Sequence, residues 1–272
     1  MMTGKTFIGG TDIYTAFGAF VTDGGYSGLV EFPSLKTVEY NDWQEEDGIE
    51  PDLSSPVLDT KDVSIPFAFV GTRIDPFVAA LSDKGYHSFE FRELGRTFRL
   101  RLVSVGTPTV CGDLRLVTMT FADDFPLDGY EYAEPTGSGP ETGFTLDGRD
   151  LSEYGIRILQ GTRAQLEAVS AVKPALIRNI NAVSGAYYDG DAAVRFKSRN
   201  LSLYCLVRSR TAQDFWKNHY ALLYDLTRPQ DRMLKVLGSD TVSRCYYGSM
   251  NVQEFMVANG IWMKFNLTLI KI

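Results

Sequence analysis

The stretch DVSIPFAFV at residues 62–70 decides the fold, because the chain contains its pattern twice. It is apolar enough for a buried strand, and the spacing of Ile74, Phe77 and Leu81 after it predicts a short helix. Shifted by 138 positions, residues 200–208 read NLSLYCLVR, again a strand, and residues 211–216 open a second helix. Matching elements at one fixed offset indicate a duplicated unit.

Shorter landmarks extend the match in both directions. GTDI at residues 10–13 corresponds to GRDL at 148–151, and LGR at 94–96 corresponds to LGS at 237–239. The pattern predicts a mainly β protein of two tandem units, each a β-sandwich or split barrel with one flanking helix. The expected helices span residues 73–83 and 211–226, and the expected organisation is a first unit at 1–134, a Pro/Gly/Ser-rich linker at 135–143 and a second unit at 144–272.

The polar segment at residues 41–60 is expected to be the largest difference between the units. It has little periodicity, and loops of this length inside a compact domain are usually functional or disordered. We expect an extended acidic loop here and a shorter one around Asp189 and Asp191 in the second unit; solvated charge is favoured over calcium binding, because neither has the full ligand spacing of an EF-hand. The candidate channel-facing or interface-facing residues are Glu45, Glu46, Asp47, Glu50 and Asp52.

Charge is divided unevenly along the chain. The net charge is −7, but residues 1–135 carry 10 basic against 22 acidic side chains, whereas residues 136–272 carry 17 against 12. This pattern argues against wrapping on duplex DNA, which requires one strongly basic face. It predicts that acidic and basic halves attract each other during assembly, and that salt weakens this attraction. The remaining acidic groups, at residues 45–52 or at Asp123 and Asp124, are expected to face a channel or an adjoining ring.

Groups suited to catalysis do not cluster in the sequence. His87 and His219 belong to no metal or triad motif, and they are expected to be structural. The three cysteines have no CxxC spacing and are expected to be free thiols. The sequence therefore predicts that the protein is not an enzyme and has no cofactor and no metal site. No apolar run reaches the length of about 20 residues that spans a bilayer, and we expect synthesis in the cytoplasm.

The segment FTLDGRDLSEYGI at residues 144–156 resembles the opening of the distal tail proteins of tailed bacteriophages. The strand and long loop at 36–52, the strand-helix step at 62–83 and the closing FADDFP at 121–126 are also similar to that family. The resemblance covers nearly the whole chain, once per repeat. It implies two tandem tail-tube-like repeats, and family members form rings around the DNA channel between the tube and the tip of the baseplate.

Because a typical family member pairs one such unit with a different C-terminal domain, a distal tail, hub or tube position stays open. The resemblance implies a structural protein of a phage, prophage or contractile injection system. Its expected partners are copies of itself in a trimeric or hexameric ring and other tail or baseplate proteins; DNA passes through without specific binding, and no membrane is involved. The implied location is the virion tail, assembled in the bacterial cytoplasm. The alternative is a two-domain carbohydrate-binding module that recognises the host surface through loop aromatics such as Tyr40, Trp43, Tyr130 and Tyr132.

Overall fold

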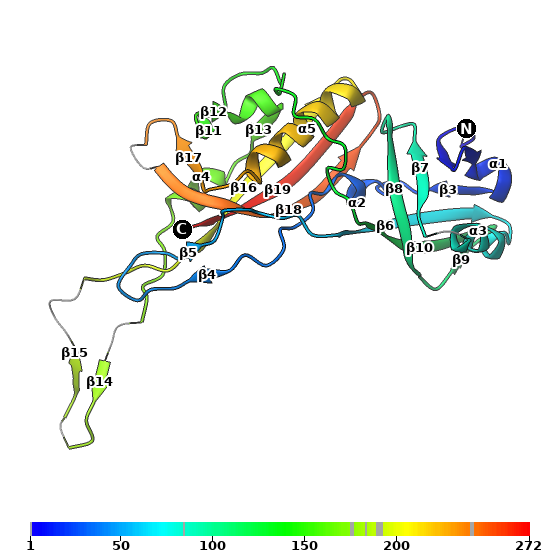
Figure 1. Cartoon of the computed structure of the whole chain (residues 1–272). Coiled ribbons are helices and arrows are strands. Elements are labelled where there is room, and N and C mark those ends of the chain that lie inside the picture. The colour runs from blue at the N-terminus through cyan, green and yellow to red at the C-terminus, as the bar shows by residue number, and fades with distance from the viewer. Residues whose placement is uncertain (1, 84, 175–176, 183, 189–192, 240–241) are drawn as a thin grey trace.

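Two β-rich units lie side by side in the computed structural model of the chain (Figure 1), which describes residues 2–83, 85–174, 177–182, 184–188, 193–239 and 242–272. Each unit is built on one antiparallel sheet, and the two sheets use residues 6–123 and 144–271. The predicted fold class, mainly β in two tandem units, is confirmed.

Within the described residues, the first unit is built from ten strands and three helices. Its strands are β1 (Thr6–Ile8), β2 (Thr11–Asp12), β3 (Ala19–Val21), β4 (Tyr40–Asn41), β5 (Glu50–Pro51), β6 (Lys61–Val70), β7 (His87–Phe91), β8 (Arg96–Val105), β9 (Thr109–Cys111) and β10 (Leu114–Asp123). Its helices are α1 (Ile13–Phe17), α2 (Ser27–Val30) and α3 (Ile74–Ser82).

The second unit repeats this element order with longer strands near its end. Its strands are β11 (Phe144–Leu146), β12 (Arg149–Asp150), β13 (Ile156–Ile158), β14 (Ile177–Asn179), β15 (Ala186–Tyr188), β16 (Arg199–Ser209), β17 (Arg232–Val236), β18 (Val242–Met256) and β19 (Ile261–Lys271). Its helices are the 3₁₀ turn η1 (Leu151–Tyr154), α4 (Thr162–Glu167) and α5 (Ala212–Leu226).

The two sheets have the same strand order. The first runs β2-β1-β7-β8-β10-β6-β3, with β9 added beside β10, and the second runs β12-β11-β17-β18-β19-β16-β13. Strand for strand these correspond, and α3 and α5 occupy the same place in the order. The shared topology confirms the duplication. The short helices α1, α2 and α4 and the turn η1 were not expected from the sequence.

Equivalent aspartates begin both units in the same way. The side chain of Asp12 accepts a hydrogen bond from the Tyr14 backbone N–H at 3.0 Å and caps α1. Asp150 accepts from the Ser152 N–H at 2.8 Å and caps η1. Capping satisfies backbone donors that have no partner inside the first turn of a helix. The landmark pair found in the sequence is therefore a pair of N-caps.

The core of the first unit forms on one face of β6. Ile65, Phe67 and Phe69 alternate along this strand and are fully buried, as the period of two residues predicts. The ring of Phe67 packs against Phe77 on α3 and Phe121 on β10, with centroids 5.3 and 6.3 Å away. Helix α3 and the sheet thus share one apolar cluster.

The segment expected to be an extended acidic loop is extended, and its backbone pairs within an arm. In the first arm (residues 34–59), Leu35 bridges Leu58, and β4 pairs with β5. In the second arm (residues 171–197), Val172 bridges Phe196, and β14 pairs with β15. The arms are of nearly equal length, so the second unit does not have the shorter connection that was expected. Asp189 and Asp191 lie outside the described residues.

The two arms differ in what they contact. The first arm crosses from its own unit to the second unit, whereas β14 and β15 extend away from the body of the molecule (Figure 1). The predicted linker lies against the second unit: the Thr136 N–H donates to Asn218 Oδ1 at 2.8 Å, and the Gly137 N–H donates to the Glu153 carbonyl at 2.6 Å. A Cβ at Gly137 would lie 2.1 Å from the Gly155 nitrogen, so only glycine fits there.

We expect Phe67→Ala to lower the free energy of unfolding by about 3–5 kcal/mol, because the truncation leaves a cavity in a closely packed aromatic core. Urea denaturation followed by tryptophan fluorescence measures this change. A loss below about 1 kcal/mol would place the face of β6 outside the core.

Candidate functional site

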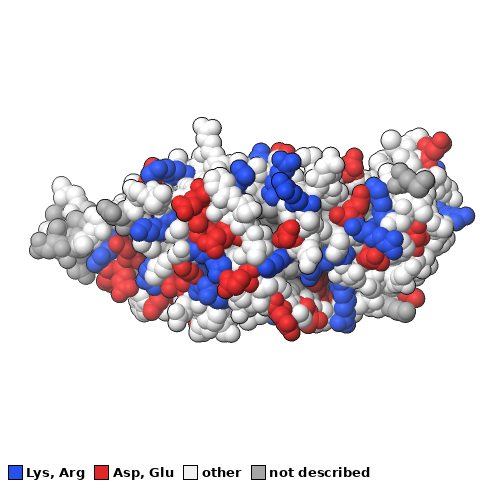
Figure 2. Space-filling view, turned by 90° about the horizontal axis from the view of Figure 1, so that it is seen from above, with Lys and Arg blue, Asp and Glu red and all other residues white. Residues whose placement is uncertain are grey.

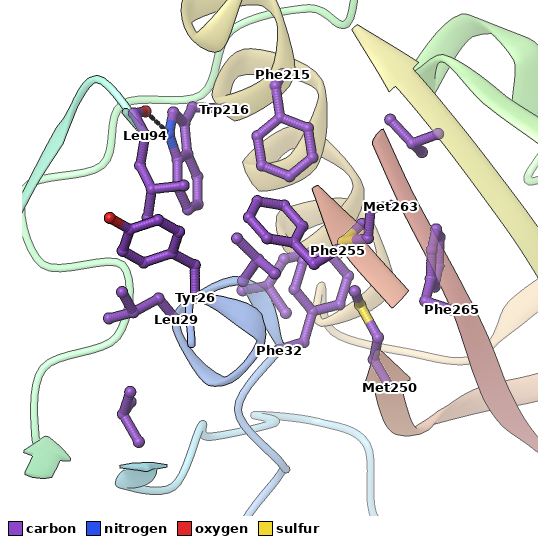
Figure 3. Close-up of a cluster of buried hydrophobic side chains, with 14 of the residues drawn as sticks. Tyr26, Leu29, Phe32, Leu94, Phe215, Trp216, Met250, Phe255, Met263 and Phe265 are labelled. Carbon is purple, nitrogen blue, oxygen red and sulfur yellow. Dashed lines mark hydrogen bonds between the residues drawn. The ribbon is translucent and has the colours of Figure 1, made fainter. Parts of the chain in front are cut away.

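The junction between the two units joins different surfaces of the two units. The first unit supplies α2, the segment that follows it and the turn between β7 and β8; the second unit supplies α5 and β18. Leu29, Phe32 and Leu94 from the first unit and Phe215 and Phe255 from the second are all at most 7% exposed. Figure 3 shows these side chains gathered in one cluster. The buried core is therefore continuous across the two units.

Trp216 connects the junction to the turn of the first unit. Its indole Nε1 donates to the Leu94 carbonyl at 2.7 Å, and its ring lies edge-on to Phe98 at 5.7 Å. The guanidinium of Arg96 lies over the Trp216 and Tyr220 rings at 5.1 and 4.3 Å. A buried tryptophan N–H with a partner avoids the cost of an unsatisfied donor.

Further hydrogen bonds join the segment after α2 to β18. Tyr247 donates its hydroxyl to the Pro33 carbonyl at 3.0 Å. The Val252 N–H donates to Glu31 Oε1 at 2.9 Å. These bonds fix the register of the first unit on β18, which apolar contacts alone do not specify.

His219 lies inside the junction, stacked on Phe215 at 5.0 Å and tilted against Phe32 at 4.4 Å. Burial, and next the nearby charge of Lys61, lowers the pKa of His219 to about 3. The Lys61 ammonium donates to the Leu29 and Glu31 carbonyls, each at 2.9 Å, and burial lowers its own pKa to about 8. A neutral imidazole is thus part of the packing.

The acidic residues singled out in the sequence lie near the tip of the first arm, at its contact with the second unit. Asp47 Oδ1 accepts from the Phe196 N–H at 2.8 Å, and the Gly48 N–H donates to the Phe196 carbonyl at 2.8 Å. Near them, Asp42 forms an ion pair with Lys173 at 2.6 Å. The first arm is therefore tied to the root of the second arm.

The other acidic candidates are exposed on the first arm. Glu50 accepts from the Trp43 indole N–H at 3.0 Å, and Asp52 accepts from the Ser54 hydroxyl at 2.7 Å. Hydrogen bonds from Ser54 lower the pKa of Asp52. Glu45 and Glu46 are exposed at the tip. Of the five candidates, the structure brings Asp47 to a contact with the second unit; a position facing a channel or an adjoining ring stays a prediction for the group.

Asp124 has several partners within the first unit. It accepts from Arg101 at 2.8 and 3.0 Å, from Tyr86 at 2.8 Å and from Thr60 at 2.7 Å. The Arg101 and Thr60 hydrogen bonds hold the pKa of Asp124 well below its usual range. At the neighbouring Asp123, burial raises the pKa. The pair is thus used for structure, with different environments on the two carboxylates.

The loop tyrosines considered for sugar stacking pack on α5. Tyr130 lies 5.6 Å from Tyr220, and Tyr132 lies 4.9 Å from Tyr224. Beside Tyr132 is a hollow of about 410 Å³ that also contains Asp225 and Arg149. Asp225 accepts from the hydroxyls of Tyr154 and Tyr132 at 2.6 and 3.2 Å. The rings of Tyr130 and Tyr132 hold the chain before the linker on α5. Tyr40 and Trp43, both on the first arm, are 59% and 50% exposed.

The remaining candidate residues have structural surroundings. His87 is buried, and its Nε2 lies 2.9 Å from the Leu81 carbonyl. Cys205 and Cys245 are buried free thiols with raised pKa values caused by burial, and Cys111 is an exposed free thiol. Among the described residues, no three His, Cys, Asp or Glu side chains are placed to hold a metal ion. None of the described helices is both long and apolar enough to span a membrane.

We expect Trp216→Ala to lower the free energy of unfolding by about 3–5 kcal/mol, because it removes a buried ring and leaves the Leu94 carbonyl without its donor. The matched control is Trp43→Ala, a half-exposed tryptophan whose loss should cost less than about 1 kcal/mol. Urea denaturation of both variants measures the difference. Equal costs would mean that Trp216 does not hold the junction together.

Acid should weaken the junction through His219. Its pKa in the folded protein is about 3, while an unfolded histidine titrates near 6.5. The contribution of neutral His219 to the free energy of unfolding is therefore fully present above pH 6.5 and is lost as the pH falls toward 3. Between pH 7 and pH 4 the free energy of unfolding of the wild type should fall by up to about 3 kcal/mol more than that of His219→Phe, because phenylalanine cannot be protonated. Parallel pH profiles of unfolding free energy for the two proteins would contradict this assignment.

Comparison with known proteins finds similarity to solved structures. No protein-family model matches the chain, and no curated protein matches it. Among solved structures, it is similar to the SPP1 Dit protein (gp 19.1), presented as a paradigm of the hub adsorption apparatus in phages that infect Gram-positive bacteria. The identity is 18% and the TM-score is 0.32; the match covers 47% of this chain and spans about half, 49%, of the Dit chain. Likeness at this level does not transfer the function of that protein to this chain.

Proposed function

We propose that the chain is a structural component of a phage tail or of a related injection machine, where copies of it form a ring around the DNA channel. The observation that carries the proposal is the head-to-tail contact between two units of the same topology. Because the contact joins unlike surfaces, it is heterologous, and a repeated heterologous contact between similar units generates a closed ring or an open filament. The resemblance of residues 144–156 to distal tail proteins supports the same role.

In such a ring, first and second units alternate, and a trimer would present six similar units. This would suit a distal tail or hub position between a six-fold tube and the tip. Other tail or baseplate proteins would be the further partners, and the virion tail would be the final location after assembly in the bacterial cytoplasm. The role is structural, with no catalytic step assigned to any residue.

The surface charge supports passage of DNA rather than binding to it. Figure 2 shows acidic and basic side chains interspersed over one face of the molecule, with no large basic patch there. Wrapping on duplex DNA would require a continuous basic face. The acidic excess of the first half would repel phosphate if it lined a channel.

Mass photometry of the purified chain, alone and with candidate tail partners, tests the ring. We expect a discrete closed oligomer whose subunit count gives the ring size. A strict monomer at every soluble concentration, with and without partners, contradicts the proposal. A glycan array separates it from the carbohydrate-binding alternative: specific sugar binding that is lost in Trp43→Ala would favour the alternative.

Salt should slow ring assembly, because attraction between the acidic and basic halves acts mainly on the association rate. Light scattering during assembly from about 50 mM to about 1 M salt measures this, since the Debye length shrinks to about 3 Å at 1 M. Completed rings should persist in high salt if their contacts are as apolar as the junction. Identical rates across this range would show that the charge division does not steer association.

A further inference from the structure

Residues of the first unit that the junction buries have exposed counterparts in the second unit. The turn between β7 and β8 carries Leu94, which is fully buried against α5; the equivalent turn between β17 and β18 carries Leu237, which is 71% exposed. Phe32 follows α2, precedes the first arm and is 6% exposed. Val169 follows α4, precedes the second arm and is 82% exposed.

The receiving surface, the part of one unit on which the other unit packs, shows the opposite contrast: it is buried in the second unit and exposed in the first. Strand pairing places Met250 and Phe255 of β18 opposite Leu267 and Met263, and both are at most 7% exposed. In the first unit the corresponding positions are Val105, opposite Met119, and Val110, opposite Arg115. These valines are 39% and 64% exposed. The first unit thus presents, uncovered, the surface that the second unit uses.

Helix α3 adds one more position to this receiving surface. Trp216 follows the buried Phe215 on α5, just as Val78 follows the buried Phe77 on α3. Trp216 lies against the backbone of Leu94, so Val78 occupies the position that would meet Leu237 of another unit. Val78 is partly buried and packs against the core.

The arms show the same contrast between a filled and an unfilled contact. Lys173 follows the bridging residue Val172, and the first arm covers it so that it is 5% exposed, paired with Asp42 and with the Trp43 carbonyl, each at 2.6 Å. Lys36 follows the bridging residue Leu35 in the first unit and is exposed. The second arm meanwhile carries apolar side chains that are 42–57% exposed: Ile177, Ile180 and Tyr187.

We propose that the junction within the chain recurs between chains. The second unit of one copy packs on the first unit of the next copy, with Val169 against Val105 and Val110, Leu237 against Val78, and the second arm over Lys36. Single exposed apolar residues are ordinary on protein surfaces. Here they fall at positions whose counterparts are buried, on two faces that the duplicated topology makes complementary. A second copy of the chain is the occupant because it supplies both faces.

This inference rests on the proposed ring and specifies its contact. Each interface would bury one uncovered face of a first unit and one of a second unit, so that neither remains exposed in a closed ring. The second arm, now exposed to water, would lie against the first unit of the next copy, as the first arm lies against the second unit within the chain. An isolated two-stranded hairpin is at best marginally stable alone.

Disulfide cross-linking in the full chain tests the contact. The variant carries Val169→Cys and Val110→Cys, with Cys111→Ser to remove the exposed native thiol; the matched control replaces Val169→Cys by Tyr224→Cys, which is 40% exposed on α5 beside Tyr132. After mild oxidation, we expect the first pair to form a ladder of covalent multimers and the control pair to remain largely monomeric in denaturing gels.

A second variant, Leu237→Asp, places a charge in the proposed contact at a position that is 71% exposed in the single chain. We expect mass photometry to show at least a tenfold smaller fraction of the chain in oligomers, while the melting temperature of the monomer stays unchanged. If the wild type forms rings but Leu237→Asp assembles equally well and the 169–110 pair does not cross-link, this contact is wrong while the ring stands. If the wild type forms no oligomer at all, both the ring and this contact are overturned.

Discussion

The structure depends on the burial of one unit's apolar projections in the face of a like unit. Phe32 and Leu94 lie on separate segments of the first unit, and both are buried in the core cluster that spans the two units. In the second unit, α5 and β18 pack against these side chains, and the Trp216 indole N–H donates a hydrogen bond to the Leu94 carbonyl. Non-directional apolar burial supplies the attraction, and a few hydrogen bonds set the register.

The two units share their topology but differ on the faces of this contact. Strand order, the N-cap aspartates and the paired arms are the same in both units. Equivalent residues on the contact faces differ in exposure. In the first unit the projecting side chains are buried by the second; in the second unit the equivalents, Val169 and Leu237, face solvent.

The arm gives the acidic segment a physical role that differs from that of a solvated loop. Its backbone is paired along much of its length, and Asp42 and Asp47 bind groups at the root of the second arm. Carboxylates that accept hydrogen bonds from a neighbouring unit position that unit. Part of the negative charge of the first half therefore lies in a contact with the more basic second half of the same chain.

Much of the fold was predictable from the sequence because its signals are local. Alternation along residues 62–70 and 200–208, the helical spacing after each and the repeated GTDI and GRDL segments predicted two mainly β units with one helix each. The shorter helices were not predicted. A strand or a cap depends on neighbours within a few residues, so the pattern of side chains is enough to identify it. The paired form of the arms was missed, because their strands are only two or three residues long.

What only the tertiary structure decided is which surfaces meet. Leu94 and Leu237 occupy matching LG turns, yet one is fully buried and the other is 71% exposed. Likewise, nothing near His219 in the chain reveals that Phe32, far away in sequence, covers it. Burial between units depends on the path of the linker and the arm through space. The sequence by itself determined two units of one kind; their packing determined which of their faces are covered and which remain open.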